Sequence, residues 1–113
     1  MKIITKTVSL KKLWDECESG LIDMIKIVVD IKQEIIAADA EMHADLEEIL
    51  LENGSQQHDL WGANIYPENS VEDMLEYTSF INIRPGQNNR SMEIENPEIR
   101  DKVRSIVQKL IVK

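Results

Sequence analysis

The stretch IIAADAEMHADLEEILLENGSQQHDLWGANIY, residues 35–66, decides which fold is predicted. Between positions 36 and 46 every even residue is apolar, and most odd residues are polar. A period of two places such residues on opposite faces of a β-strand. Ala, Glu and Met favour helices intrinsically, but tertiary burial often overrides propensity. We therefore predict a strand over residues 36–46, with one apolar face and one acidic face.

The remainder of this stretch predicts a bulge, a turn and two further strands. Glu47 and Glu48 break the alternation, which predicts a bulge or bend before a strand at Ile49–Glu52. Asn53-Gly54-Ser55 favours positive φ and predicts a long hairpin loop. Leu60–Tyr66 is the predicted partner strand, within which Gly62 permits a bulge or a close approach by another group.

The N-terminal third predicts a strand, a helix and a second strand. The expected strands are Lys2–Lys6 and the β-branched Met24–Ile31, and the latter turns through residues 32–34 into the alternating stretch. Between them Ser9 can cap a helix that ends at Gly20. Its apolar positions fall at spacings of three and four, at Leu10, Leu13, Trp14 and Cys17.

The C-terminal third predicts two helices around one strand. Ser70–Glu76 is a predicted short helix with a capping-box-like pair, and Thr78–Arg84 is the predicted last strand. The final helix begins with Asn96 as its cap and Pro97 as its first residue. Its apolar stripe consists of Ile99, Val103, Ile106, Val107, Leu110 and Ile111.

These elements predict a single α+β domain over residues 1–113. Strands follow one another along the chain, and helices lie at both ends. We expect an antiparallel β-meander of about five to six strands. The N-terminal helix and the C-terminal amphipathic helix would pack on one face. The other face would carry the acids and be either solvated or an interface between copies.

Composition and charge exclude several functional classes. No apolar run approaches the length of a membrane span or a signal peptide, so we expect no membrane association. Cys17 is the only cysteine, which favours the reducing cytoplasm. The net charge is −8, and residues 33–83 contain twelve Asp or Glu and no Lys or Arg. Such a segment repels phosphates, so nucleic acid is not an expected partner.

The acidic segment has two interpretations. A solvated surface that keeps the protein soluble is the simpler one. The alternative is a surface that binds a cation or a basic protein partner.

A first candidate site is the acidic face of the predicted strand over residues 36–46. Glu41, His43 and Asp45 would lie about 7 Å apart in succession. An imidazole between carboxylates can act as a general base, or ligate a metal if His58 and Asp59 converge on it. No metal-binding spacing such as HExxH or CxxC is present, so no metal is predicted. The simpler interpretation is an exposed histidine among acids.

A second candidate is the loop after the predicted last strand. Arg84, Asn89, Arg90 and Ser91 offer two guanidiniums, an amide and a hydroxyl that could hold an anionic small ligand. The loop lacks the glycines and the lysine of a phosphate-binding loop, so no nucleotide cofactor is predicted. The simpler interpretation is that the arginines pair with nearby acids and fix the loop to the sheet.

A third candidate is the strand Leu60–Tyr66. Trp61 and Tyr66 are residue types that often anchor interfaces, and Asn64 shares a strand face with Tyr66. Because the chain has only five aromatic residues, packing of Trp61 in the core is the simpler interpretation.

Three sequence blocks resemble a known family. EMHAD (41–45), LLENGSQQHDLWGANIYPE (50–68) and INIRPGQNNRS (81–91) are similar to the signature blocks of a small prokaryotic family of uncharacterised proteins, a domain of unknown function. The similarity covers nearly the whole chain. The family pattern has Asp-Gly-Ser at 53–55 and Gly-Asn-Arg-Ser at 88–91, where this chain has Asn53 and Asn88. The resemblance implies no activity.

The sequence therefore predicts a cytoplasmic, non-enzymatic domain that binds a ligand or a protein and acts as a homodimer. The alternative is a small hydrolase-like enzyme. In it His43, with Asp45 or Glu41, would serve as base or metal ligand. Arg84 or Arg90 would then hold an anionic substrate.

Overall fold

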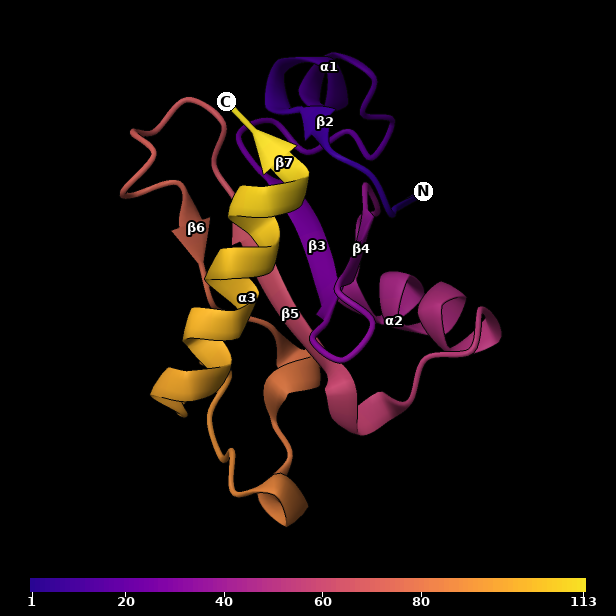
Figure 1. Ribbon diagram of the computed structural model, residues 1–113, viewed down its shortest axis with the longest axis vertical. Helices are drawn as coiled ribbons and strands as arrows, with labels where there is room; N and C mark the ends of the chain where they lie inside the picture. Colours follow the sequence, from indigo (N-terminus) through magenta and orange to yellow (C-terminus); the bar gives the residue numbers. More distant parts are fainter.

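The structure, a computed structural model, describes all of residues 1–113 and confirms the α+β class. A five-stranded antiparallel sheet runs in the order β1-β4-β3-β5-β6, and β2 pairs with β7 in a separate parallel pair (Figure 1). The strands are β1 (Lys2–Ile4), β2 (Val8–Ser9), β3 (Ile25–Asp30), β4 (Ile35–Ala38), β5 (Leu60–Ile65), β6 (Leu75–Glu76) and β7 (Ile111–Val112). The helices are α1 (Leu10–Asp15), α2 (His43–Glu52) and α3 (Pro97–Leu110), with 3₁₀ turns η1 (Gln57–Asp59), η2 (Phe80–Asn82) and η3 (Pro85–Gln87).

Strand β3 is the centre of the sheet, with β4 and β5 on its two sides. It pairs with β5 over its full length, and Ile27 lies opposite Ala63. Because β5 follows β4 in the chain but lies across β3 from it, the order differs from that of a simple meander. The connection between β4 and β5 is α2, which crosses the sheet.

Helices cover both faces of the sheet. As predicted, α1 and α3 pack on one face, where their apolar side chains join alternate residues of β3 and β5 in a core of 18 residues. The other face was expected to be solvated or an interface. Instead, α2 covers it with a second core formed by Val28, Ala37, Ala40, Leu46, Leu50 and Leu60. No helix is long and apolar enough to span a bilayer.

The predicted strand over residues 36–46 is wrong beyond Ala38. Asp39 has a φ of +76°, which turns the chain out of β4, and α2 begins at His43. The buried residues His43, Leu46 and Leu50 follow the helical spacing of three and four. The helix-favouring Ala, Leu and Glu residues therefore decide this segment, and the alternation extends only through β4.

The predictions that depended on that strand are also wrong. Glu47, Glu48 and residues 49–52 lie within α2 and form neither a bulge nor a strand. Asn53-Gly54-Ser55 ends this helix instead of opening a hairpin. Gly54 has a φ of +100°, and the Ser55 N–H donates to the Leu50 carbonyl oxygen at 2.9 Å. This is the type of hydrogen bond that closes helix C-termini.

Two predictions in the C-terminal half are wrong because contacts between distant residues decide the structure. Residues 70–74 form turns, and β6 follows at Leu75 instead of a helix. The predicted strand Thr78–Arg84 is replaced by η2, which Ser79 caps by accepting a hydrogen bond from the Ile81 N–H. There the Asn82 side chain pairs with β5. It accepts from the Gly62 N–H at 2.9 Å and donates to the Gly62 carbonyl at 3.0 Å.

The elements with clear caps or periodicity are confirmed. Ser9 caps α1, although this helix ends at Asp15, before Gly20. Asn96 caps α3, which begins at Pro97, and the predicted apolar stripe of this helix faces the core up to Leu110. Ile111, the last predicted member of the stripe, is buried but lies in β7.

The predicted close approach at Gly62 is confirmed. A Cβ at this position would lie 2.5 Å from the Cβ of Ser79.

Candidate functional site

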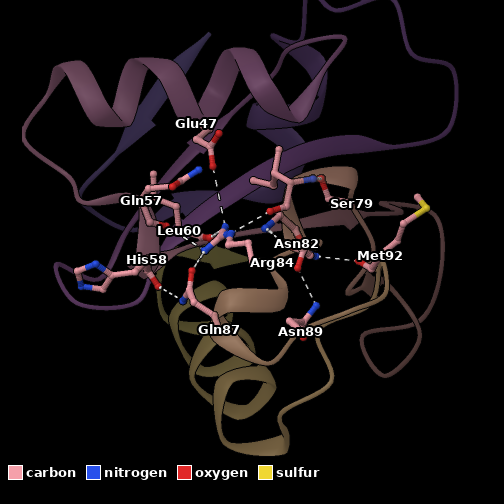
Figure 2. Close-up of polar contacts among 12 residues, drawn as sticks. Glu47, Gln57, His58, Leu60, Ser79, Asn82, Arg84, Gln87, Asn89 and Met92 are labelled. Atoms are coloured by element: carbon pink, nitrogen blue, oxygen red, sulfur yellow. Dashed lines mark hydrogen bonds and ion pairs between the residues drawn. The ribbon is translucent and has the colours of Figure 1, made fainter.

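Arg84 lies between η2 and η3, and its guanidinium contacts four protein oxygens (Figure 2). Nε donates to the Ile81 carbonyl at 3.0 Å, and one terminal nitrogen donates to the carbonyl of Gln57 at 2.9 Å and to Oε1 of Gln87 at 3.1 Å. The other terminal nitrogen donates to the carbonyl of Leu60. The predicted anion-binding donors of Arg84 are thus directed at the protein itself.

Arg84 also contacts two side chains from other elements. Its guanidinium carbon lies 4.6 Å from the centre of the Trp61 ring, a cation–π contact, and Nη2 lies 3.9 Å from Oε2 of Glu47 on α2. Burial lowers the pKa of Arg84 and raises the pKa of Glu47, and the attraction between the two charges opposes both shifts. The predicted pairing of Arg84 with a nearby acid matches this geometry.

Asn89 fixes the loop that follows Arg84. Its amide nitrogen lies 2.7 Å from the Asn82 carbonyl and 2.8 Å from the Glu93 carbonyl, and its Oδ1 accepts from the Glu95 N–H at 2.8 Å. Asn88 adopts a φ of +62°, a conformation that asparagine tolerates. The loop is therefore held in one shape by a buried amide.

The carboxylate of Glu95 closes the same loop. Its Oε2 accepts from the backbone N–H groups of Arg90 and Ser91, both at 2.8 Å. These hydrogen bonds lower the pKa of Glu95 and keep it ionised. The predicted binding residues Arg90 and Ser91 thus hold Glu95 through their backbone, and their side chains are exposed.

A cavity of about 240 Å³ lies between this loop and the start of α3; we call it the Trp61 cavity. Trp61 lines it from β5, and three amide residues of the loop contribute further polar surface. The rest of its wall comes from the residues around the N-terminus of α3. The complete lining is Trp61, Gln87, Asn88, Asn89, Glu95, Asn96 and Ile99.

Two residues that line the Trp61 cavity carry a polar group without a hydrogen-bond partner in the chain. Trp61 is only 1% exposed, yet its indole Nε1 has no acceptor. Asn96 uses Oδ1 to cap the Glu98 N–H at 2.8 Å, which leaves its amide nitrogen available. Buried polar groups are normally satisfied, so the indole N–H is an exception. Less than 1 Å² of Nε1 is accessible, so a molecule in the cavity does not contact this nitrogen.

His43, the predicted base, lies at the start of α2 under the sheet. Its Nε2 is 2.9 Å from the Ala63 carbonyl oxygen, which can only accept, so Nε2 carries the proton. Burial lowers the pKa of the imidazole and keeps it neutral. The neighbouring Asn64 donates to Glu76 Oε1 at 2.8 Å and to the Thr78 carbonyl, but its own Oδ1 has no partner.

The structure does not bring the predicted catalytic set together. Glu41 and Asp45 are exposed, whereas His43 is buried. His58 is largely exposed, with only Asp59 close to it, at 3.4 Å. No group of three or more His, Cys, Asp or Glu side chains could hold a metal ion.

Burial, the largest cause, and the neighbouring Asp39 raise the pKa of the Cys17 thiol to about 11, which favours the protonated thiol at neutral pH.

Sequence reasoning named Trp61 and Asn89 but missed Gln87, Glu95 and Asn96. The signal for Asn96 was present, because a capped helix start was predicted there and such a start can bind ligands. Nothing in the sequence indicated that β5 would bring Trp61 next to it.

Comparison with known proteins places the chain in a family. Neither the curated proteins nor the solved structures give a match. Residues 2–110 match the family described as "Protein of unknown function (DUF5674)". This match confirms the predicted resemblance to a small family of uncharacterised proteins. Because it spans nearly the whole chain, the protein belongs to the DUF5674 family.

Proposed function

We propose that the protein is a non-enzymatic binding domain that holds one small polar ligand in the Trp61 cavity. The observation that carries this proposal is the cavity itself, in which Trp61 and Ile99 lie beside the side chains of Gln87, Glu95 and Asn96. Glu95 and Asn96 are exposed, so their polar groups can meet those of a ligand in the cavity.

The surroundings of the cavity also suit a binding site. Its wall combines apolar surface from Trp61 and Ile99 with a few fixed polar groups, as ligand sites commonly do. Arg84 packs over the indole and Asn89 holds the loop, so the wall is rigid before any ligand arrives. Such preorganisation lowers the entropic cost of binding.

The experiment follows the indole N–H of Trp61 in ¹H–¹⁵N spectra of the full chain. The chain has two tryptophans, so Trp61→Phe and Trp14→Phe assign the two signals. Small polar compounds of several classes are added: the common L-amino acids, ribose, glycerol, nucleosides and acetamide. A saturable shift of the Trp61 signal, with the Trp14 signal unchanged, supports the proposal. If none of these compounds moves the Trp61 signal, the proposal is wrong.

The hydrolase-like alternative has less support. A neutral imidazole with one N–H fixed by a carbonyl is suited to general base catalysis. However, His43 contacts Ala63 and Arg84 contacts Leu60, positions about 10 Å apart along β5. A base and an anion-binding group that act on one small substrate would need to lie closer together.

We also propose that the protein is a cytoplasmic homodimer that pairs through β1. This strand ends the sheet order, so no strand of the chain pairs with its outer edge. Ile3 in this strand and Met1 just before it are exposed apolar residues. An open apolar edge favours pairing with another strand. The free thiol of Cys17 suits a reducing compartment.

A further inference from the structure

We infer that the groove between β6 and α3 binds an extended, lysine-containing segment of a partner protein, which adds a strand to the sheet at β6. This groove shares no lining residue with the Trp61 cavity, and β6 lies at the opposite end of the sheet from β1. Three features carry the inference: unpaired backbone groups on β6, an apolar groove beside them, and acidic residues around both.

The outer edge of β6 has free backbone groups at Leu75. The Tyr66 N–H donates to the Met74 carbonyl at 2.7 Å, and the next pair in the register is Ile65 with Leu75. In an antiparallel ladder, hydrogen-bonded and non-hydrogen-bonded pairs alternate, so Leu75 belongs to a non-hydrogen-bonded pair. Its N–H and C=O therefore point away from β5, to the side on which no strand pairs with β6.

The chain covers this edge beyond β6 but not at Leu75. The Ile94 N–H donates to the Tyr77 carbonyl, and the Ser79 N–H donates to the Met92 carbonyl, both at 3.0 Å. This short pairing ends where the chain turns into α3. Neither the N–H and C=O of Leu75 nor the N–H of Tyr77 has a partner on this side. The edge thus offers two donors and one acceptor to an added strand.

An apolar groove of about 380 Å³ lies beside this edge, between β6 and α3 (Figure 1). Leu75 and Tyr77 line it from the sheet and Val107 from α3, and Val71 and Met74 complete its apolar surface. Val71 is 53% exposed, so part of this surface is open to solvent. Alternate side chains of an added strand point to one face of the sheet, so apolar residues at every second position would enter the groove.

The charges near the groove favour a basic segment. Residues 68–76 contain four acids and no Lys or Arg. Glu72 lines the groove, is exposed and forms no ion pair. Arg104, the only basic residue in the lining, is paired with Asp101 at 2.6 Å. An acidic segment would be repelled here, whereas lysines that alternate with the apolar residues would be attracted.

The experiment adds the synthetic peptide acetyl-KVKVKVK-amide to the ¹⁵N-labelled full chain. We expect saturable shifts of the backbone signals of Leu75 and Tyr77, and slower hydrogen exchange at both, because their N–H groups gain acceptors. The peptide acetyl-EVEVEVE-amide keeps the alternation and reverses the charge, so it should bind at least about tenfold more weakly. Equal binding of the two peptides would overturn the inference of a basic partner.

Two further peptides test the backbone pairing. They carry N-methyl groups either on every valine or on every lysine of the basic peptide. Successive residues of a strand point their N–H groups to opposite sides, so only one of the two sets faces β6. We expect one methylated peptide to bind at least about tenfold more weakly than the other. Equal binding of both would overturn strand addition.

Two substitutions at exposed positions test the groove in the protein. Val71→Lys places a positive charge on its wall and should weaken binding of the basic peptide at least about fivefold. Val112→Lys is the matched control, because Val112 is 45% exposed and lies outside the groove. Glu72→Gln should weaken binding about two- to fivefold, as expected for one exposed ion pair, and Glu52→Gln on α2 is its control. Unchanged binding in both Val71→Lys and Glu72→Gln would overturn the inference.

A second copy of the chain is the competing occupant of this groove. If the Leu75 and Tyr77 signals change with the concentration of the protein alone, the groove binds another copy and the inference is wrong. If about 1 mM basic peptide, enough to detect a Kd of that order, moves neither signal, the inference is also wrong. Neither result bears on the Trp61 cavity, because the two sites share no residue.

Discussion

At the scale of single residues, the contact between β5 and η2 depends on one glycine. The backbone of Gly62 pairs with the Asn82 amide, and a Cβ on Gly62 would lie 2.5 Å from Ser79 Cβ and 2.7 Å from its Oγ. Asn82 is fully buried, so this pairing cannot be replaced by water. The side-chain amide of Asn82 forms the hydrogen bonds to the β5 backbone that a neighbouring strand would otherwise form.

Replacing this glycine tests the packing directly. We expect Gly62→Ala to lower the free energy of unfolding by about 2 kcal/mol, because the methyl group must displace η2. Gly86→Ala is the control, since nothing lies within 4 Å of its Cβ position, and its effect should stay within about 0.5 kcal/mol. Urea unfolding measures both. Equal effects of the two substitutions would contradict the close contact.

His43 makes stability depend on pH. Burial lowers the pKa of its imidazole in the folded state, so the unfolded chain takes up a proton first as pH falls. The contribution of His43 is therefore fully present above the unfolded pKa of about 6.5 and is lost as pH falls towards the lower folded pKa. We expect the wild-type free energy of unfolding to fall relative to that of His43→Gln between about pH 7 and pH 5.

The exposed histidine supplies the control for this pH dependence. His58→Gln removes an imidazole with a side-chain exposure of 61% and serves as the comparison for loss of a largely exposed histidine. Urea unfolding at several pH values measures all three proteins. If the wild type and His43→Gln lose stability in parallel below pH 7, burial does not lower the pKa of His43 in the folded state, and the prediction is wrong.

At the scale of elements, β3 and α3 could be predicted because their own residues determine them. A run of β-branched residues in β3 and a capped amphipathic stripe in α3 leave little choice. The alternation over residues 36–46 predicted a strand wrongly, because alanine fits either face of a strand and also favours a helix. The replacement of a predicted strand by η2 depended on Asn82 reaching Gly62, 20 residues away, which no local pattern encodes.

The same reasoning explains how far the candidate site could be predicted. Trp61 and Asn89 were recognisable as unusual residues in their own segments. The Trp61 cavity itself requires the loop around Asn89, the start of α3 and β5 to meet, and this depends on the fold as a whole.

The end of β4 is set by Asp39, which has a φ of +76° and accepts hydrogen bonds from the N–H groups of Glu18 and Ser19 at 3.0 Å. We expect Asp39→Ala to lower the free energy of unfolding by about 3 kcal/mol, since it loses buried hydrogen bonds and keeps the unfavourable φ. Asp39→Gly loses the same hydrogen bonds without the backbone strain and should cost about 1 kcal/mol less. Thermal or urea unfolding compares the two. If Asp39→Gly is no more stable than Asp39→Ala, backbone strain does not contribute at this position.

At the scale of the whole molecule, the two helical layers differ in their charges. Helix α2 and its flanking residues contain only acidic charges, whereas α3 carries both signs. The two layers lie on opposite faces of the sheet, and β1, at the end of the strand order, has a neighbouring strand on one side only. This arrangement favours association through the edge, because face-to-face contact between two acidic α2 layers would be repulsive.

The proposed dimer is tested by its mass and by one edge substitution. Light scattering should give about 26 kDa, twice the 13.0 kDa of the chain. Ile3→Lys places a charge on the β1 edge, a change that natural edge strands use against pairing, and should reduce the mass to that of one chain. Phe80→Lys is the control, because Phe80 is 77% exposed on η2, beside β5 and away from β1. A wild-type monomer would exclude the dimer, and loss of the dimer only in Phe80→Lys would move the interface to η2.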